Sequence, residues 1–329
     1  MEVSCPLDMM RFFRRLPRSV NGSKRYGKAW GDMVRILQAL LLLFFYRRSA
    51  PVKNQLVFLL GTGLASATSP TRLENKKMTG ATERQLREEL AACYRLIAHF
   101  RMSDLIFTHI SVRIPGPEHH FLINPYGLMF EEITASSLVK IGLDGRAVEA
   151  SAHGVNPAGF VIHSAIHGAR EDAQCVLHTH TRAGCAVAAL ECGLLPVNQI
   201  SMEFYGKVAY HDYEGVALDM DEQQRLVRDL GDKPVLMLRN HGLLTVGETV
   251  SQAFLRMYYL EKACDIQIAA QACGKLILPP ADVCEYTERQ FNEPGRSLEE
   301  GELADLDAMR LAWAALLRLL DRVSPGFRE

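Results

Sequence analysis

The stretch Cys175-Val-Leu-His-Thr-His180 joins a short apolar run to two histidines that are one residue apart. An apolar run of this length predicts a short strand. Side chains at positions i and i+2 of a strand lie on the same face, so the imidazoles of His178 and His180 can converge on one ion. The end of this strand is therefore a candidate position for metal-binding residues.

Regular apolar patterns continue on both sides of this strand. Upstream, Thr82 and Gln85 fit a capping box, and apolar residues at three- and four-residue spacing as far as Phe100 predict an amphipathic helix. The other expected strands are residues 110–114, 121–124, 138–143, 200–205, 234–238 and 243–246. The other expected helices are residues 159–170, 181–190, 221–230, 250–273 and 302–320. This order predicts one α/β domain with a mixed sheet between helices.

A third histidine lies at the end of another expected strand, in the turn Asn240-His241-Gly242. The glycine is expected to supply a positive φ angle for that turn. Three imidazoles from two strand ends, without a fourth ligand nearby, match a catalytic zinc site, because a structural site would be closed by four ligands. The alternative is a chance pattern in a chain with 11 histidines.

Charge is divided unevenly along the 329 residues. Residues 1–77 contain 14 Lys and Arg and 4 Asp and Glu, an excess of ten positive charges, whereas the other 252 residues carry an excess of eleven negative charges. This asymmetry predicts a boundary near residue 77. The formal net charge of −1 argues against a general nucleic-acid-binding protein, which needs a basic face on its folded part.

Residues 1–77 permit two interpretations. A basic flank, an apolar run from Val34 to Tyr46 and a later Ser66-Ala67 ending are typical of an anchor or an export signal. However, no apolar run there reaches the ~20 residues that a spanning helix needs. We favour Met78 as the start of the folded protein and expect no membrane association of residues 1–77. The expected divisions are a basic, partly apolar extension at 1–77, a main domain at 78–275, and a C-terminal loop and helix at 276–329.

Three segments resemble the class II aldolase/adducin family: Asn156–His167, Cys175–His180 and Leu238–Gly247. The resemblance covers about residues 82–275 and implies a three-layer α/β/α fold with a mixed, largely antiparallel sheet. It also implies one Zn²⁺ per subunit, held by His178, His180 and His241. In the enzymatic members of the family this zinc is a Lewis acid that stabilises the oxyanion formed as a carbon–carbon bond breaks.

The sequence departs from the sugar-phosphate aldolases of this family. Their Ser-Ser-Glu stretch, in which the serines hold phosphate and the glutamate transfers protons, corresponds to Pro157-Ala158-Gly159. Their Gly-Asn-x-Ser phosphate loop corresponds to Thr108-His109-Ile110-Ser111, and a Thr-Gly pair corresponds to Tyr126-Gly127. The resemblance therefore implies a substrate without phosphate, and the catalytic residues stay unassigned because Gly159 cannot transfer a proton.

Other side chains are candidates for the missing role. His163 and His167 lie on one face of the helix that contains Gly159. They could act as a substitute base or an extra ligand. Alternatively, this face packs under the sheet and each ring forms a hydrogen bond with a carbonyl group. The packed face is the favoured interpretation. Glu203 and Tyr205 on the expected strand 200–205 are further candidates, with a solvated face as the alternative.

Three more polar side chains have simpler expected roles. Arg113 and Arg239 could bind an anionic substrate, although surface ion pairs are favoured for both. His211 is expected to be a capping or surface residue.

Two hypotheses about function remain. The first is a zinc-dependent lyase that cleaves a carbon–carbon bond in a small hydroxy-carbonyl compound. The second is a non-catalytic interaction domain, because the adducin head belongs to the same family, is not known for enzymatic activity and resembles this chain more closely over Asn156–Ile166 and Leu238–Gly247. The resemblance implies a homo-oligomer, usually a tetramer, and the acidic body indicates a cytoplasmic protein.

Overall fold

The computed structural model describes residues 81–292 and 308–329, so the expectations for residues 1–77 and for the start of the C-terminal helix lie outside the described residues. All described residues belong to one compact unit. The expected boundary at residue 77 stays a prediction. In the described ranges, the structure contains no helix with both the length and the apolar character needed to cross a membrane.

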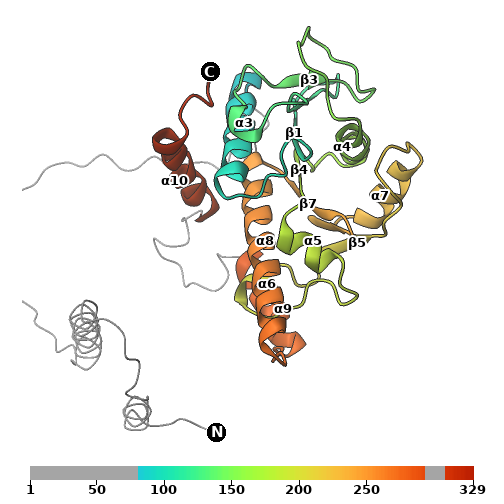
Figure 1. Ribbon diagram of the computed structural model, residues 1–329, viewed down its shortest axis with the longest axis vertical. Helices are drawn as coiled ribbons and strands as arrows, with labels where there is room; N and C mark the ends of the chain where they lie inside the picture. Colours follow the sequence, from blue (N-terminus) through green and yellow to red (C-terminus); the bar gives the residue numbers. More distant parts are fainter. Residues whose placement is uncertain (1–80, 293–307) are drawn as a thin grey trace, which may run out of the picture. The chain divides into compact units, whose positions relative to one another are not determined.

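A seven-stranded sheet forms the middle layer of this unit (Figure 1). From one edge to the other its strands are β3 (Val139–Ile141), β2 (Phe121–Ile123), β1 (His109–Arg113), β4 (Cys175–Thr179), β7 (Gly242–Gly247), β6 (Val235–Leu238) and β5 (Val208–His211). Neighbouring strands are antiparallel, except that β5 and β6 are parallel. The predicted mixed, largely antiparallel sheet is confirmed.

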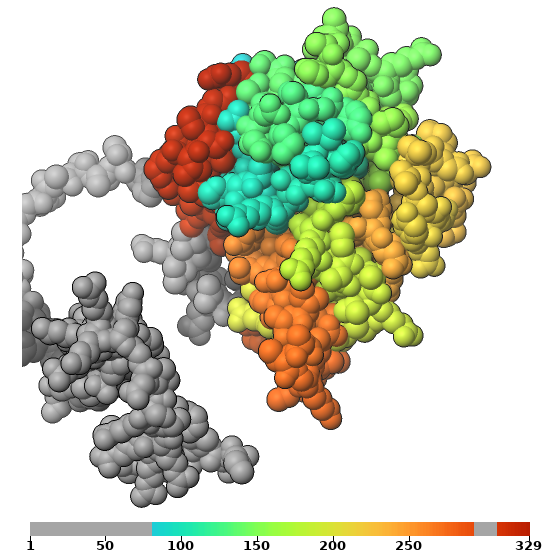
Figure 2. Space-filling view, in the orientation of Figure 1, coloured from blue at the N-terminus to red at the C-terminus, as the bar shows by residue number. Residues whose placement is uncertain are grey.

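Helices cover both faces of the sheet (Figure 1). One layer contains α3 (Glu83–His99), α5 (Arg182–Ala188) and α8 (Val250–Cys273), and the other contains α4 (Pro157–Ala169) and α7 (Glu222–Leu230). The C-terminal helix α10 (Ala308–Val323) packs against α3 and α8, and Figure 2 shows its surface beside that of α3. The predicted α/β/α layering is therefore confirmed. The remaining helical elements are η1 (Phe130–Glu132), α6 (Gln199–Met202) and α9 (Ala281–Asn292).

The central strand β4 is buried along its whole length because both of its faces are covered. Cys175 and Leu177 belong to the core beneath α3 and α8, whereas Val176 belongs to the core beneath α4 and α7. His178 follows Val176 at a spacing of two and therefore lies on the α4 face. This alternation places the first histidine of the motif inside the protein.

Three local expectations are wrong. Residues 200–205 do not form a strand, because Asn198 and Ser201 form a capping box that starts α6, and a turn follows. The sequence does not predict β5, and His211 at its end is buried rather than on the surface. Residues 281–292, which were expected to be loop, form α9.

Candidate metal centre

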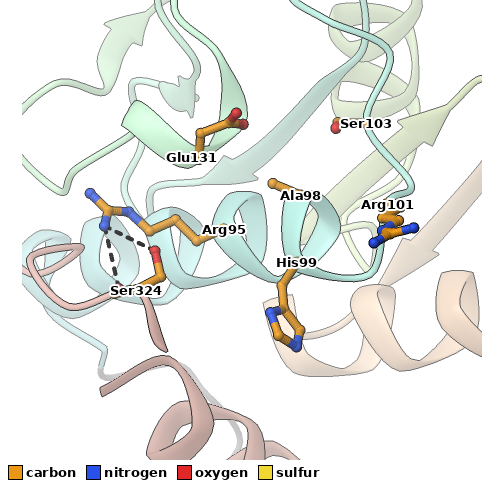
Figure 3. Close-up of a pocket in the computed structure, with 7 residues that line it drawn as sticks. All are labelled: Arg95, Ala98, His99, Arg101, Ser103, Glu131 and Ser324. Carbon is orange, nitrogen blue, oxygen red and sulfur yellow. Dashed lines mark hydrogen bonds between the residues drawn. The ribbon is translucent and has the colours of Figure 1, made fainter. Parts of the chain in front are cut away.

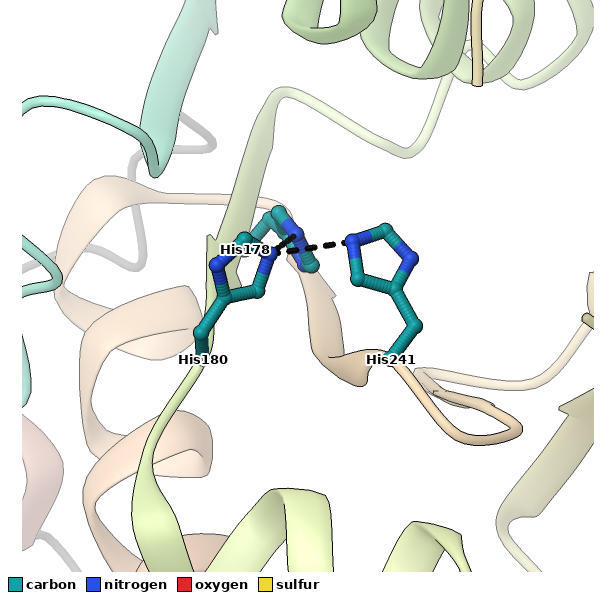
Figure 4. Close-up of side chains that lie close together, drawn as sticks. All are labelled: His178, His180 and His241. Atoms are coloured by element: carbon teal, nitrogen blue, oxygen red, sulfur yellow. Dashed lines mark hydrogen bonds between the residues drawn. The ribbon is translucent and has the colours of Figure 1, made fainter. Parts of the chain in front are cut away.

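The three histidines meet where β4 and β6 end and β7 begins (Figure 4). His178 lies near the end of β4, His180 follows that strand, and His241 lies in the turn between β6 and β7. The Nε2 atom of His180 lies 2.8 Å from Nε2 of His178 and 2.9 Å from Nε2 of His241. Because β7 pairs with both β4 and β6, the register of the sheet itself brings together residues that are 61 positions apart.

The turn that carries His241 differs from the prediction in one respect. The residue with a positive φ is Asn240, at 55°, and not Gly242. Asparagine tolerates this conformation better than most residues. Gly242 is required for a different reason: a Cβ atom there would lie 2.5 Å from the Thr179 carbonyl oxygen and 3.2 Å from Cε1 of His178. The glycine therefore allows close approach of two strands next to the histidines.

Hydrogen bonds fix the tautomers of two of the rings. Nδ1 of His178 lies 2.9 Å from the Leu243 carbonyl oxygen, and Nδ1 of His180 lies 3.0 Å from a carboxylate oxygen of Asp104. These oxygens only accept, so each Nδ1 donates its proton and each Nε2 carries a lone pair. Lone pairs that face each other at 2.8 Å repel unless a cation lies between them. The donor set fits zinc, for which tetrahedral ligand nitrogens lie ~3.3 Å apart.

Asp104 is the residue that sequence reasoning missed. It lies in the loop between α3 and β1, 76 positions before His180. A carboxylate behind a ligating histidine orients the ring and raises its basicity. Nothing in the local sequence distinguishes it from any other exposed loop aspartate, because its partner is brought to it only by the fold.

Burial keeps two of the three rings, those of His178 and His241, neutral. It lowers the pKa of His178 well below its usual value, and the neighbouring histidines lower it further. Burial, with His180 next in importance, lowers the pKa of His241 to about 4. Neutral imidazole is the form that binds a metal ion, so both groups are ready ligands near neutral pH.

His163 and His167 lie elsewhere, on the face of α4 that covers β1. His167 donates from Nδ1 to the Ala173 carbonyl oxygen at 3.0 Å, and its Nε2 lies 2.7 Å from Oγ of Ser111. His163 lies between Ser111 and His109, at 2.5 Å and 2.8 Å. Both rings are buried, and neither belongs to the set of three converging ligands.

The remaining candidates do not join the histidine set either. Glu203 lies in the turn after α6, where burial raises its pKa to about 7 and Arg256 is its charged neighbour. Tyr205 lies in the same turn. The two arginines bind backbone carbonyl groups rather than carboxylates: Arg113 donates to His167, and Arg239 donates to Leu190 at 2.5 Å.

A hollow of about 360 Å³ lies beside the end of α3 and contains none of the three histidines (Figure 3). Arg95 donates to Oγ of Ser324 at 3.3 Å at one side of it (Figure 3). The histidine cluster is therefore a separate feature. The residues around the hollow are Arg95, Ala98, His99, Arg101, Ser103, Glu131 and Ser324.

The fold and the site define an α/β/α protein with three histidines converging at the ends of central strands. The family described as class II aldolase and adducin N-terminal domain matches residues 88–268, and the chain belongs to this family. A solved aldolase II superfamily protein from Pseudomonas syringae is 50% identical, with a TM-score of 0.69, and the match covers 76% of this chain and 97% of that one.

Two further relatives represent the two branches of the family. An L-fuculose 1-phosphate aldolase from Glaciozyma antarctica PI12 is 30% identical, with a TM-score of 0.64 and coverage of 80% of this chain and 97% of that one. Alpha-adducin from Rattus norvegicus is 40% identical over 287 residues, which are 85% of this chain but only 38% of alpha-adducin.

Proposed function

We propose that the protein is a zinc-dependent lyase of class II aldolase type that cleaves a carbon–carbon bond in a small, unphosphorylated hydroxy-carbonyl compound. The observation that carries this proposal is the convergence of three imidazole Nε2 atoms, two of them with their tautomers fixed by acceptors behind the rings. Three protein ligands leave one zinc position for substrate. Zinc bound there would act as a Lewis acid on a substrate oxygen.

The chain's own residues have separate roles in this proposal. His178, His180 and His241 would hold one zinc ion per subunit. The Leu243 carbonyl group and Asp104 orient two of the rings, so the ligands need little rearrangement when the ion binds. The catalytic residues stay unassigned, because Gly159 offers no side chain that transfers a proton.

The start of α4 supports the substrate class. Asn156 caps this helix by accepting from the Ala158 N–H at 3.1 Å, and the next residues, Pro157, Ala158 and Gly159, provide no hydroxyl or carboxyl group. Serine hydroxyls would be needed there to hold a phosphate as the resemblance describes. The relative from Glaciozyma antarctica is named for a phosphorylated sugar, so a phosphorylated aldol is the competing substrate class.

We also propose a cytoplasmic homo-oligomer, a tetramer by resemblance, with an interface close to the metal centre. The loop after β5 supports this interface, because it exposes several apolar side chains and its Tyr213 ring lies 6.5 Å from the His241 ring. The exposed apolar side chains of this loop are Tyr213, Val216, Leu218 and Met220.

Metal content tests the proposal directly. Full-length protein purified without added metal should contain about one zinc ion per chain by elemental mass spectrometry. A chelator should lower its melting temperature, and His178→Ala should abolish both the zinc and the chelator effect. His153→Ala, in an exposed loop, is the matched control and should behave as wild type. Protein without zinc, or an unchanged His178→Ala variant, would remove the lyase proposal.

Substrate class needs a second experiment. The zinc-loaded protein should cleave members of a panel of unphosphorylated aldols faster than their phosphorylated counterparts. A preference for the phosphorylated compounds would leave the lyase proposal intact and refute the proposed substrate class.

The second candidate function is a non-catalytic oligomerisation domain of the adducin-head type. The observation in its favour is the identity to rat alpha-adducin over most of this chain. This candidate predicts normal assembly of the metal-free protein and no cleavage of any aldol in the panel, so the same two experiments distinguish it from the lyase.

A further inference from the structure

A buried chain of hydrogen bonds runs from the end of α4 to the neighbourhood of the metal centre. It starts at the Ala173 carbonyl group and passes through His167, Ser111 and His163 to His109. All four side chains in it are buried, with His163 fully enclosed. The proposed function assigns no role to these residues.

With one proton on each ring, the chain of hydrogen bonds has one consistent set of proton positions. The Ala173 carbonyl oxygen can only accept, so His167 donates from Nδ1 and its Nε2 is a lone pair. Ser111 must then donate its single hydroxyl proton to His167 and accept from Nδ1 of His163. Nε2 of His163 therefore accepts from Nδ1 of His109, which leaves Nε2 of His109 as a lone pair.

The register of the sheet places His109 beside the metal ligands. His109 in β1 lies directly opposite His178 in β4, so the two side chains share one face of the sheet. Their ring centroids are 5.1 Å apart. Nevertheless His109 does not belong to the converging set of ligands, because its nitrogens are too far from the other three.

His109 also occupies the space in front of Gly159. A Cβ atom on residue 159 would lie 2.7 Å from Cδ2 and 3.1 Å from Nε2 of the His109 ring. Any other residue at 159 would displace this ring. The His109 ring therefore packs in this position because residue 159 has no side chain.

We propose that His109 is a substrate-binding residue that accepts a hydrogen bond from a hydroxyl group at Nε2, and that this lone pair excludes phosphate from the same position. Above pH 7 a phosphate monoester is mainly the dianion, whose terminal oxygens only accept, so it needs N–H or O–H donors. His109 provides none toward the site, and Ser111, the serine that matches the phosphate loop, has already donated its proton. This inference rests on the proposed function, which it deepens by defining the substrate group that is recognised.

The proton positions can be measured without any substitution. Long-range ¹H–¹⁵N correlation of the histidine rings in full-length, zinc-loaded protein should show His109 with a protonated Nδ1 and an unprotonated Nε2. Ser111→Ala, which breaks the chain of hydrogen bonds, should alter the ring signals of His163 and His109. An Nε2–H tautomer of His109 would overturn the proposal, and the same measurement on metal-free protein decides the point even if the lyase proposal fails.

Two glycines on α4 provide a matched test of this packing arrangement. Gly159→Ala should lower the melting temperature, and His109→Ala in the same chain should reverse the loss. Gly168→Ala is the control, because an added Cβ there meets no described atom within 4 Å. Equal behaviour of the two single glycine variants would show that His109 does not fill this space, and would overturn the proposal.

Ligand selection is tested at pH 8 with two probes on the zinc-loaded protein, methyl phosphate and dihydroxyacetone. His109→Asn introduces a side-chain N–H donor, so calorimetry should show at least about tenfold tighter methyl phosphate binding than wild type and weaker dihydroxyacetone binding. Zinc content should stay at wild-type level in this variant. Unchanged affinities for both probes, or loss of zinc, would overturn the assignment of His109 as a substrate acceptor.

Discussion

At the scale of single residues, the most informative contact is the one between Asp104 and Nδ1 of His180, at 3.0 Å. The aspartate holds the ring so that Nε2 faces the other two histidines. Its side chain is about 43% exposed, so its effect on folding stability is small, and in the proposed metal centre we expect its larger effect to be on zinc affinity.

We therefore expect Asp104→Asn to weaken zinc binding by about 10- to 100-fold while the protein remains folded. The physical reason is that an amide accepts a weaker hydrogen bond and can turn its NH₂ group toward the ring. Competition with a chromogenic chelator measures the affinity. Asp144→Asn, in the exposed hairpin turn, is the control. Equal zinc affinity of the two variants would remove the assigned role of Asp104.

Gly242→Ala should destabilise the protein by about 1–3 kcal/mol, because the added methyl group would lie 2.5 Å from the Thr179 carbonyl oxygen and must displace β4 or the turn. Urea unfolding measures the loss of free energy. Gly154→Ala is the matched control, since no described atom lies within 4 Å of its added Cβ. A Gly242→Ala variant as stable as Gly154→Ala would contradict the close approach of the strands.

At the scale of elements, the helix starts are determined locally. Thr82 and Gln85 form the predicted capping box at the start of α3, and Thr249 begins α8 by accepting from the Gln252 N–H at 3.1 Å. The helix α8 then runs over the range expected from its apolar spacing, Val250–Cys273. It covers the same sheet face as α3, so the cap at its start also affects the packing of the core.

Thr249→Ala should reduce the free energy of unfolding by about 1 kcal/mol, because the Gln252 N–H loses its acceptor at the first turn of α8. Thermal and urea unfolding both report this loss. Thr287→Ala, which removes a hydroxyl donated to Val283 on the exposed helix α9, should change stability by less than about 0.5 kcal/mol. If Thr249→Ala lowered the free energy of unfolding as little as Thr287→Ala does, the cap would not be needed for stability.

At the scale of the whole molecule, the described unit encloses an unusual number of neutral histidines. Burial lowers the pKa of His167 to about 3 and that of His241 to about 4, and it lowers those of His109, His163 and His178 well below their usual values. In the unfolded chain these rings titrate near 6.5. The unfolded state therefore binds more protons than the folded state below that pH.

Stability should consequently be highest above pH ~6.5 and decrease as the pH falls toward the folded-state pKa values, by about 1.4 kcal/mol per pH unit for each such ring. Urea unfolding of the metal-free protein at a series of pH values between 7.5 and 5 measures the slope. His167→Gln should reduce the slope by the contribution of about one ring, and His153→Gln in the exposed loop should leave the slope unchanged. A stability that does not depend on pH would contradict the buried neutral rings.

Most elements and the layering follow from local signals: caps, apolar spacing and turns. The exceptions have physical causes. Residues 200–205 alternate like a strand, but the capping box of Asn198 and Ser201 starts a helix there instead. Strand β5 forms through its pairing with β6, which no local pattern in the sequence predicts. The histidine set was predictable because strand periodicity determines which side chains share a face.

The sequence by itself determined the fold class, the family and the identity of the three converging histidines, because these depend on periodicity and on motifs confined to short stretches. Only the tertiary structure decided what surrounds them. Asp104 reaches His180, and His109 fills the space of Gly159, through a strand register and a helix packing that bring together residues 50 to 76 positions apart. Such contacts have no local signal, since proximity in the folded chain is set by the sheet and not by spacing along the sequence.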